Sequence, residues 1–223
     1  MTHASPLSAT VVFHVGPVPI TQPVISTWAI MLVMVLVSWG MTRRLQLRPT
    51  LVQTALEELI TGIGREITGV VQRDAGQLLP LLGTLFLFLA AANVSGVLPG
   101  VRAPTASLET PAALALIVFL AVHYFGIRAR GLLGYLASFA EPKLIMLPLN
   151  VIAELTRTFS LTVRLFGNVM SGEFVLALVV ALAGLLVPIP LMALELLIGI
   201  VQAYIFTILA TVFIGAAMGG ERQ

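Results

Sequence analysis

The sequence predicts an all-α integral membrane protein with about five membrane helices, and three observations support this fold class. Of the 223 residues, 58% are apolar and only 10% are charged, against roughly 25% charged residues in an ordinary soluble domain. The mean hydropathy is +1.04, and the apolar residues gather in stretches long enough to cross a bilayer. The formal net charge of +2 indicates no nucleic-acid partner, and the absence of cysteine excludes disulfides, thiolate metal sites and a cysteine nucleophile.

Five apolar stretches have the length of about 20 residues that a membrane-spanning helix needs. They lie at residues 24–42, 78–98, 111–127, 144–187 and 191–218. Residues 24–223 are therefore expected to form a single membrane domain after an N-terminal segment, 1–23, that lacks the features of a cleaved signal peptide. Pro188 and Pro190 mark the gap between the last two spans, because proline cannot continue a helix. The connection at 99–111 has the composition of an ordinary polar loop.

Residues 50–76 predict an amphipathic helix on the cytoplasmic membrane surface. Apolar side chains recur there at helical spacing, at Leu51, Ala55, Leu59, Ile63, Ile67 and Val70. Charged side chains occupy other positions of the same segment, so that one face is apolar and the other polar. Such a helix lies in the plane of the membrane interface, in contact with the lipids.

The basic residues predict the orientation of the chain, because cytoplasmic loops are rich in lysine and arginine. They follow the first and third spans, at Arg43, Arg44, Arg48, Arg65, Arg73, Arg128, Arg130 and Lys143. The opposite loops contain only Arg102. The N-terminus is therefore expected outside and the C-terminus in the cytoplasm, which agrees with an odd number of spans.

Charged residues inside the last two spans are the main functional signal, because each costs at least about 2.5 kcal/mol near the bilayer centre. They are Glu154, Arg157, Arg164, Glu173 and Glu195. A polar stripe along one face of the fourth span comprises Asn150, Glu154, Arg157, Arg164 and Asn168. A stripe of this kind faces protein or water rather than lipid, so we predict a functional site along it.

Two carboxyl groups are predicted to lie on the outer side of this arginine. Glu173 is nine residues beyond Arg164, or ~13.5 Å further along the helix. Glu195 lies near the outer start of the last span, and Gln202 lies seven residues deeper on the same helix face. Two carboxyls that flank an outer approach above an arginine have the layout of an ion path with a charge barrier.

The last two spans are expected to be long and strongly tilted. As one helix, residues 144–187 would extend ~66 Å, about twice the thickness of the hydrocarbon core. Such a helix either breaks, near Pro148 or Gly167, or tilts. We favour tilt, because a polar stripe of this length needs a lateral partner to face.

Simpler roles remain open for some of these residues. Glu154 and Arg157, three residues apart, are equally expected to form a structural ion pair. Glu173 or Glu195 alone also fits a neutral carboxylic acid that is hydrogen-bonded inside a bundle. The main alternative function is a secondary transporter with a buried charged binding site, although the chain shows none of the internal repeats common in such folds.

The stretch SLTVRLFGNVMSGE at residues 160–173 closely resembles the signature S-L-x-x-R-L-F-G-N-x-x-x-G-E of subunit a of F-type ATP synthases. The segments PLNVIAELTR at 148–157, NVSGVLPG at 93–100 and GIVQAYIFTILATVFI at 199–214 are similar to other parts of that family. The resemblance covers nearly the whole chain from Thr50. It implies a stator subunit of a rotary ion motor in the bacterial inner membrane, with no catalytic site and no cofactor or metal of its own.

The resemblance also implies partners and residue roles. The partners would be a ring of c subunits that each carry one carboxylate, the b-subunit peripheral stalk and, through the complex, the F1 head. Arg164 would be the essential arginine that faces the ring, with Gln202 its neighbour. The other implied members of the ion path are Asn168, with Glu173 and Glu195 toward the outside, and Asn150, Glu154 and Arg157 toward the inside, where a structural role is the alternative.

Two departures from the family pattern concern the helix shape and the transported ion. Many relatives have proline where this chain has Thr158, so the helix is expected to be straighter here. Many bacterial relatives pair the outer glutamate with a histidine, where this chain has Glu195. Two neighbouring carboxyls favour a retained proton or a bound cation, so both H⁺ and Na⁺ fit as the ion.

Overall fold

The computed structural model describes residues 11–15, 18–43, 51–71, 76–96, 103–140, 145–184 and 187–219. Within these ranges the chain forms six α-helices, one 3₁₀ turn and one hairpin. The helices are α1 (Gln22–Thr42), α2 (Leu51–Val71), α3 (Leu79–Ser95), α4 (Glu109–Ala140), α5 (Met146–Ala183) and α6 (Pro188–Met218). The turn is η1 (Pro104–Ala106), and the hairpin pairs β1 (Val11–Val15) with β2 (Val18–Thr21).

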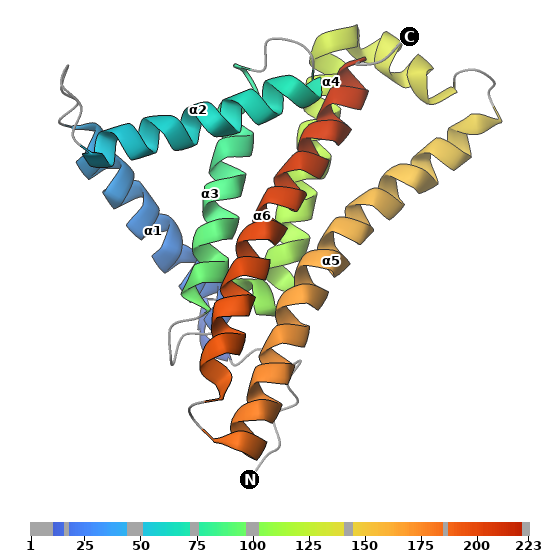
Figure 1. Ribbon diagram of the computed structural model, residues 1–223. Helices are drawn as coiled ribbons and strands as arrows, with labels where there is room; N and C mark the ends of the chain where they lie inside the picture. The colour runs from blue at the N-terminus through green and yellow to red at the C-terminus, as the bar shows by residue number, and fades with distance from the viewer. Residues whose placement is uncertain are drawn as a thin grey trace.

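The helices form a bundle that spreads toward one end (Figure 1). Helices α3, α4 and α6 lie at its centre, while α1 and α5 slope away from them on opposite sides. Helix α2 crosses over the wide end, which we call the α2 end, and the hairpin lies at the narrow end, which we call the hairpin end. The helices α1, α4, α5 and α6 are long and apolar enough to cross a membrane, and α3 is a shorter apolar helix. The chain is therefore an all-α membrane protein with several membrane helices.

Helix α5 is continuous over 38 residues, so it breaks neither at Pro148 nor at Gly167. Its length of ~57 Å exceeds the hydrocarbon thickness of about 30 Å, and in Figure 1 it runs obliquely to the central helices. Helix α6 begins at Pro188, three residues before the expected start at 191. The expectation that Pro188 and Pro190 lie in a gap was wrong, because proline is tolerated in the first turn of a helix.

Helix α4 extends beyond the expected span of 111–127, from Glu109 to Ala140, and it bends sharply at Gly131. Gly131 has φ 74° and ψ 164°, a conformation that is essentially restricted to glycine. The residues after it, which we call the α4 tail (132–140), turn across the α2 end toward the start of α5 (Figure 1). The aromatic ring of Tyr135 in this tail packs against Gly126 and leaves no room there for a side chain.

The connection between α3 and α4 is not an ordinary polar loop in the part that the structure describes. Pro104 and Thr105 of η1 are buried, and this turn packs among α1, α3, α4 and α5. The N-terminal segment also contains structure that was not expected, namely the β1–β2 hairpin. Thr21 at its end donates a hydrogen bond of 2.7 Å to Glu109 at the start of α4.

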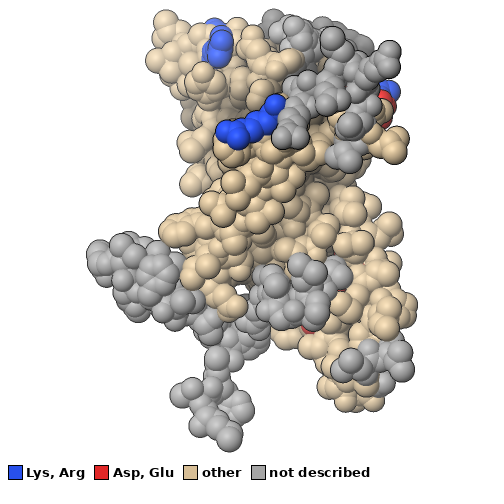
Figure 2. Space-filling view, turned by 90° about the vertical axis from the view of Figure 1, so that its left-hand side faces the viewer, with Lys and Arg blue, Asp and Glu red and all other residues tan. Residues whose placement is uncertain are grey.

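The packed core lies between α2, α3, α4 and α6 and includes Leu161 and Leu165 of α5, whereas most residues of α1 and α5 are not buried. Ile67 and Val71 in the last turns of α2 belong to this core, and Val71 lies against Gly215 of α6. Tyr204 of α6 also donates a hydrogen bond of 3.2 Å to Glu66 of α2. In the view of Figure 2, the basic side chains lie toward the α2 end, above a broad belt of uncharged side chains.

Candidate functional site

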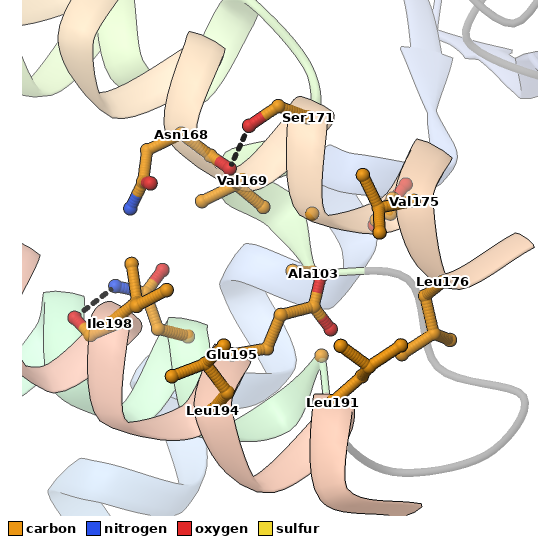
Figure 3. Close-up of a pocket in the computed structure, with 15 residues that line it drawn as sticks. Ala103, Asn168, Val169, Ser171, Val175, Leu176, Leu191, Leu194, Glu195 and Ile198 are labelled. Carbon is orange, nitrogen blue, oxygen red and sulfur yellow. Dashed lines mark hydrogen bonds between the residues drawn. The ribbon is translucent and has the colours of Figure 1, made fainter. Parts of the chain in front are cut away.

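A cavity of about 220 Å³ lies between α5 and α6 near the hairpin end (Figure 3). Its polar lining comes from three helices: Asn93 of α3, Asn168, Ser171 and Glu173 of α5, and Glu195 of α6. Figure 3 shows Glu195 extending from α6 toward α5, with Asn168 and Ser171 on the α5 side. The structure therefore brings together Glu173 and Glu195, which the sequence predicted for the outer approach, and Asn168 of the predicted polar stripe.

Glycine makes the close approach of the two helices possible in this cavity, which we call the hairpin-end cavity. A Cβ atom on Gly172 would overlap the carboxylate of Glu195, so only glycine leaves room for that carboxylate against α5. A Cβ atom on Gly199 would lie 2.8 Å from the Cβ of Asn93. Gly167 differs from these two glycines, because it lies on the exposed face of α5 and a Cβ atom on it would meet no other described atom within 4 Å.

A second cavity of about 190 Å³ lies toward the α2 end, between the α4 tail, the first half of α5 and the end of α6. Its polar lining comprises Tyr135, Ser138, Asn150, Glu154 and Arg157. We call it the α2-end cavity. The bend at Gly131 creates it, because the α4 tail supplies one of its walls.

Polar side chains of the α2-end cavity form a hydrogen bond and an ion pair with other residues that line it. Asn150 donates a hydrogen bond of 2.8 Å to the carbonyl of Phe139 in the α4 tail. Arg157 pairs with Glu154 at 3.2 Å, and its guanidinium lies 5.5 Å from the centre of the Phe213 ring. The side chain of Glu154 is only 12% exposed, whereas that of Arg157 is 49% exposed. The ion pair expected from the spacing is therefore present, and it lies in the wall of a cavity.

Arg164 lies between the two cavities along α5. It is ten residues from Glu154 and nine from Glu173, or ~15 Å and ~13.5 Å along the helix axis. Its side chain is exposed and has no hydrogen bond or ion pair with any described residue. Its neighbours Leu161 and Leu165 are buried, so Arg164 lies at the edge of the packed face of α5.

Gln202 lies apart from both cavities. It is 6% exposed, and its amide nitrogen has no hydrogen-bond partner within the described part of the chain. A buried amide without a partner is uncommon and calls for an explanation at a functional site. In the described ranges, no group of three or more His, Asp or Glu side chains is suited to hold a metal ion.

Sequence reasoning missed the contribution of the α4 tail to the α2-end cavity and the hydrogen bond from η1 to Asn93. Tyr135 and Ser138 follow a glycine bend that no pattern in the sequence indicates. Asn93 forms a hydrogen bond between helices, since its amide donates at 2.7 Å to the carbonyl of Gly199. Thr105, which donates a hydrogen bond to Asn93, lies in a segment that has the composition of a loop, so its burial was not predicted.

The helix bundle carries charged side chains within its long apolar helices. These side chains line two cavities, one on either side of Arg164. This arrangement is typical of integral membrane proteins of the ion-translocating class. Comparison with known proteins agrees with this class. The family model described as ATP synthase A chain matches residues 24–215. The chain is 67% identical over 216 residues to "ATP synthase subunit a 2" of Bradyrhizobium sp. strain BTAi1, and the match covers 97% of each chain.

More distant relatives give the same result. The chain is 48% identical over 209 residues to "ATP synthase subunit a 1" of Chlorobaculum parvum, which covers 93% of this chain and 92% of the relative. It is 45% identical over 212 residues to "ATP synthase subunit a 1" of Hahella chejuensis, and the match covers 95% of this chain and 90% of the relative. The chain belongs to the family of F-type ATP synthase subunit a. It is thus a non-catalytic, multi-pass membrane subunit of the F0 sector, and the alternative of a secondary transporter is set aside.

Proposed function

We propose that this subunit conducts ions through two offset half-channels and that Arg164 separates them. The observation that carries this proposal is the pair of polar cavities at opposite ends of α5, with the exposed Arg164 midway between them. The hairpin-end cavity serves as the outer half-channel, through Asn168, Glu173 and Glu195. The α2-end cavity serves as the inner half-channel, through Asn150, Glu154 and Arg157.

The partner that completes the path is a ring of c subunits that present carboxylates to α5. A carboxylate must be neutral to face lipid, because a bare charge there is costly. An ion that enters by one half-channel neutralises a ring carboxylate, and an ion from another ring site leaves by the other half-channel. The guanidinium of Arg164 attracts the emptied carboxylate and blocks direct passage, since arginine stays charged. Ion flow in this way drives rotation of the ring, which couples it to ATP synthesis or hydrolysis.

The exposed faces of α5 and α6 support a large lateral partner. Almost all of the apolar part of α5 is uncovered in the described chain. Large apolar side chains that are exposed on this pair of helices include Phe159, Val163, Phe174, Leu197 and Val201. Arg164 lies within this surface. We propose that the c-ring covers it, while the b-subunit stalk and the F1 head complete the complex.

We propose that the hairpin end faces outward and the α2 end faces the cytoplasm of a bacterial cell, in its inner membrane. Arg128 and Arg130 lie just before the bend in α4, and Arg130 donates a hydrogen bond of 3.3 Å to the carbonyl of Ala216, next to the Gly215 that contacts α2. This placement agrees with the preference of basic residues for the cytoplasmic side. Either H⁺ or Na⁺ fits this path, since the ring carboxylate binds the ion.

The role of Arg164 is tested by the change Arg164→Lys in the assembled complex in membrane vesicles. We expect ATP-driven ion pumping to be lost, because a buried lysine can release its proton and lacks the broad planar charge of a guanidinium. Pumping is measured by a fluorescent ion gradient indicator. Arg128→Lys is the control, since Arg128 is exposed and donates a long hydrogen bond of 3.4 Å to the hydroxyl of Tyr124, one turn earlier in α4. Retention of pumping in Arg164→Lys would refute the assigned role.

A further inference from the structure

The buried turn η1 connects to the hairpin-end cavity through a short relay of hydrogen bonds. The hydroxyl of Thr105 donates to the side-chain oxygen of Asn93 at 3.0 Å. The amide nitrogen of Asn93 donates to the backbone carbonyl of Gly199 at 2.7 Å. Thr105 is fully buried and Asn93 is 8% exposed. Three segments that are far apart in the sequence, η1, α3 and α6, are thus joined inside the bundle.

The direction of this relay determines how the amide of Asn93 is oriented. An asparagine side chain has one acceptor end and one donor end. The Gly199 carbonyl can only accept, so the donor end of the amide points toward α6 and the acceptor end toward Thr105. A carbonyl has two lone pairs, so the Gly199 carbonyl can accept this bond in addition to its bond within the helix. The hydroxyl of Thr105 holds the acceptor end and so restrains the amide in this orientation.

The contact on Gly199 lies at the level of the ion-path residues of α6. Glu195 is one turn before Gly199, ~6 Å along the axis, and Gln202 is almost one turn after it. Asn93, Gly199 and Glu195 line the same cavity. The Cβ of Asn93 also approaches Gly199 so closely that no side chain fits there. The height and rotation of α6 at this cavity therefore depend on where the Asn93 amide is held.

We propose that Thr105 is a positioning residue for ion translocation: through Asn93 it holds α6 at Gly199 and so places Glu195 in the outer half-channel. This inference rests on the function proposed above. It gives a role to the short segment between α3 and α4, which contacts α5 as well as the central helices. Thr105 touches no ion in this arrangement and acts only through the residues it orients.

The test compares Thr105→Val with Thr105→Ser in the complete complex. Valine has the shape of threonine without the hydroxyl, whereas serine retains the hydroxyl. We expect passive ion conduction in vesicles stripped of F1 to fall about five-fold in Thr105→Val, the factor that corresponds to one ordinary hydrogen bond. Thr105→Ser should restore most of it. Equal conduction in the two variants would refute the proposal.

A second readout separates positioning from a merely structural role. The chain lacks cysteine, so Leu191→Cys in the hairpin-end cavity and Ala153→Cys in the α2-end cavity each provide a single reactive thiol. In the Thr105→Val background, a water-soluble thiol reagent is given access to both sides of the membrane in permeabilised vesicles. We expect its labelling rate to change several-fold at residue 191 and to stay constant at residue 153. A change at both sites, or at neither, would contradict the proposal.

Two further outcomes keep this inference distinct from the proposed function. If Thr105→Val does not assemble, Thr105→Ala takes its place, because it removes the hydroxyl without adding a methyl group in its position. Failure of both variants to assemble would make Thr105 a folding residue and refute the positioning role. Loss of pumping in Arg164→Lys together with normal conduction in Thr105→Val would refute this inference alone.

Discussion

Glu195 shows how a single glycine determines the place of a charged group. Its carboxylate extends across the hairpin-end cavity to Gly172 of α5, which has no side chain to exclude it. Glu173 follows Gly172 and lines the same cavity. The two carboxyl groups are therefore held near each other by the geometry of the α5–α6 contact. In the proposed outer half-channel, Glu173 and Glu195 are the first acidic groups that an entering cation would meet.

The change Gly172→Ala tests this placement. The added methyl group would overlap the Glu195 carboxylate, so we expect it to displace that carboxylate and to slow ATP-driven ion pumping. Because Arg164 is untouched, the passive leak should not rise. Gly83→Ala is a matched control, since the nearest atom to a Cβ at that position is 4.0 Å away and a helical glycine is replaced in both cases. Normal pumping in Gly172→Ala would show that the position of Glu195 is not critical.

The bend in helix α4 shapes the α2-end cavity. The α4 tail carries Tyr135 and Ser138 to the cavity, and its Phe139 carbonyl accepts a hydrogen bond from Asn150. The same tail lies across the wide end of the bundle, where α5 has moved away from α6 (Figure 1). The bend thus closes an opening that the slope of α5 creates. A straight α4 would leave Glu154 and Arg157 without this wall.

The change Gly131→Ala is expected to destabilise the α4 tail. Its φ of 74° with ψ of 164° costs a residue with a side chain about 1–3 kcal/mol. We expect a lower thermal unfolding temperature of the purified complex and slower ion conduction, since the α2-end cavity loses its wall. Gly134→Ala is the control, because it lies in the same tail and its nearest neighbour, the Cβ of Arg130, is at 3.6 Å. Equal effects of the two changes would argue against a special role of the bend.

The position of α2 across the wide end of the bundle indicates where the membrane surface lies. Helix α2 crosses the wide end, and its second half attaches it to the core through Ile63, Ile67 and Val71. Its first half leaves Leu51, Leu59 and Ile60 exposed. The membrane surface is the expected environment of these exposed apolar side chains. The hydrogen bond from Tyr204 to Glu66 joins this surface helix to α6.

Cysteine labelling measures the depth of α2. We expect Leu59→Cys to be protected from a water-soluble thiol reagent, because its side chain lies on the apolar face that binds lipid. Glu57→Cys, two residues away, should react readily and serves as the control, since Glu57 is exposed on the charged part of the helix. The labelling rates of the two variants are compared in intact membrane vesicles. Equal, fast labelling at both positions would place α2 in open water and contradict the interfacial assignment.

Much of the candidate site could be predicted from residue spacing. The steps of three and four that join Asn150, Glu154 and Arg157 place them on one helix face, and the structure finds all three in one cavity. The order of the spans also placed Glu195 on the same side of the membrane as Glu173, and both line one cavity. These inferences succeed because the pitch of a helix is nearly constant and the residues lie within long helices.

The turns between helices could not be predicted in the same way. Gly131 is one of 19 glycines, and nothing local distinguishes a glycine with positive φ from one inside a helix. Thr105 lies in a polar stretch whose burial depends on how α3, α4 and α5 pack around it. Such features result from contacts between distant segments, and the spacing of residues along one helix carries no information on those contacts.

The uncovered surface of α5 has a consequence for the order of assembly. A newly inserted subunit would expose this face, with Arg164 in it, directly to lipid. An arginine near the bilayer centre costs at least about 2.5 kcal/mol there, and a neighbouring carboxylate removes much of that cost. The subunit is therefore least stable in the membrane before its partner arrives. We expect cells that lack the partner to degrade this chain rapidly, so that an unpaired ion path does not accumulate.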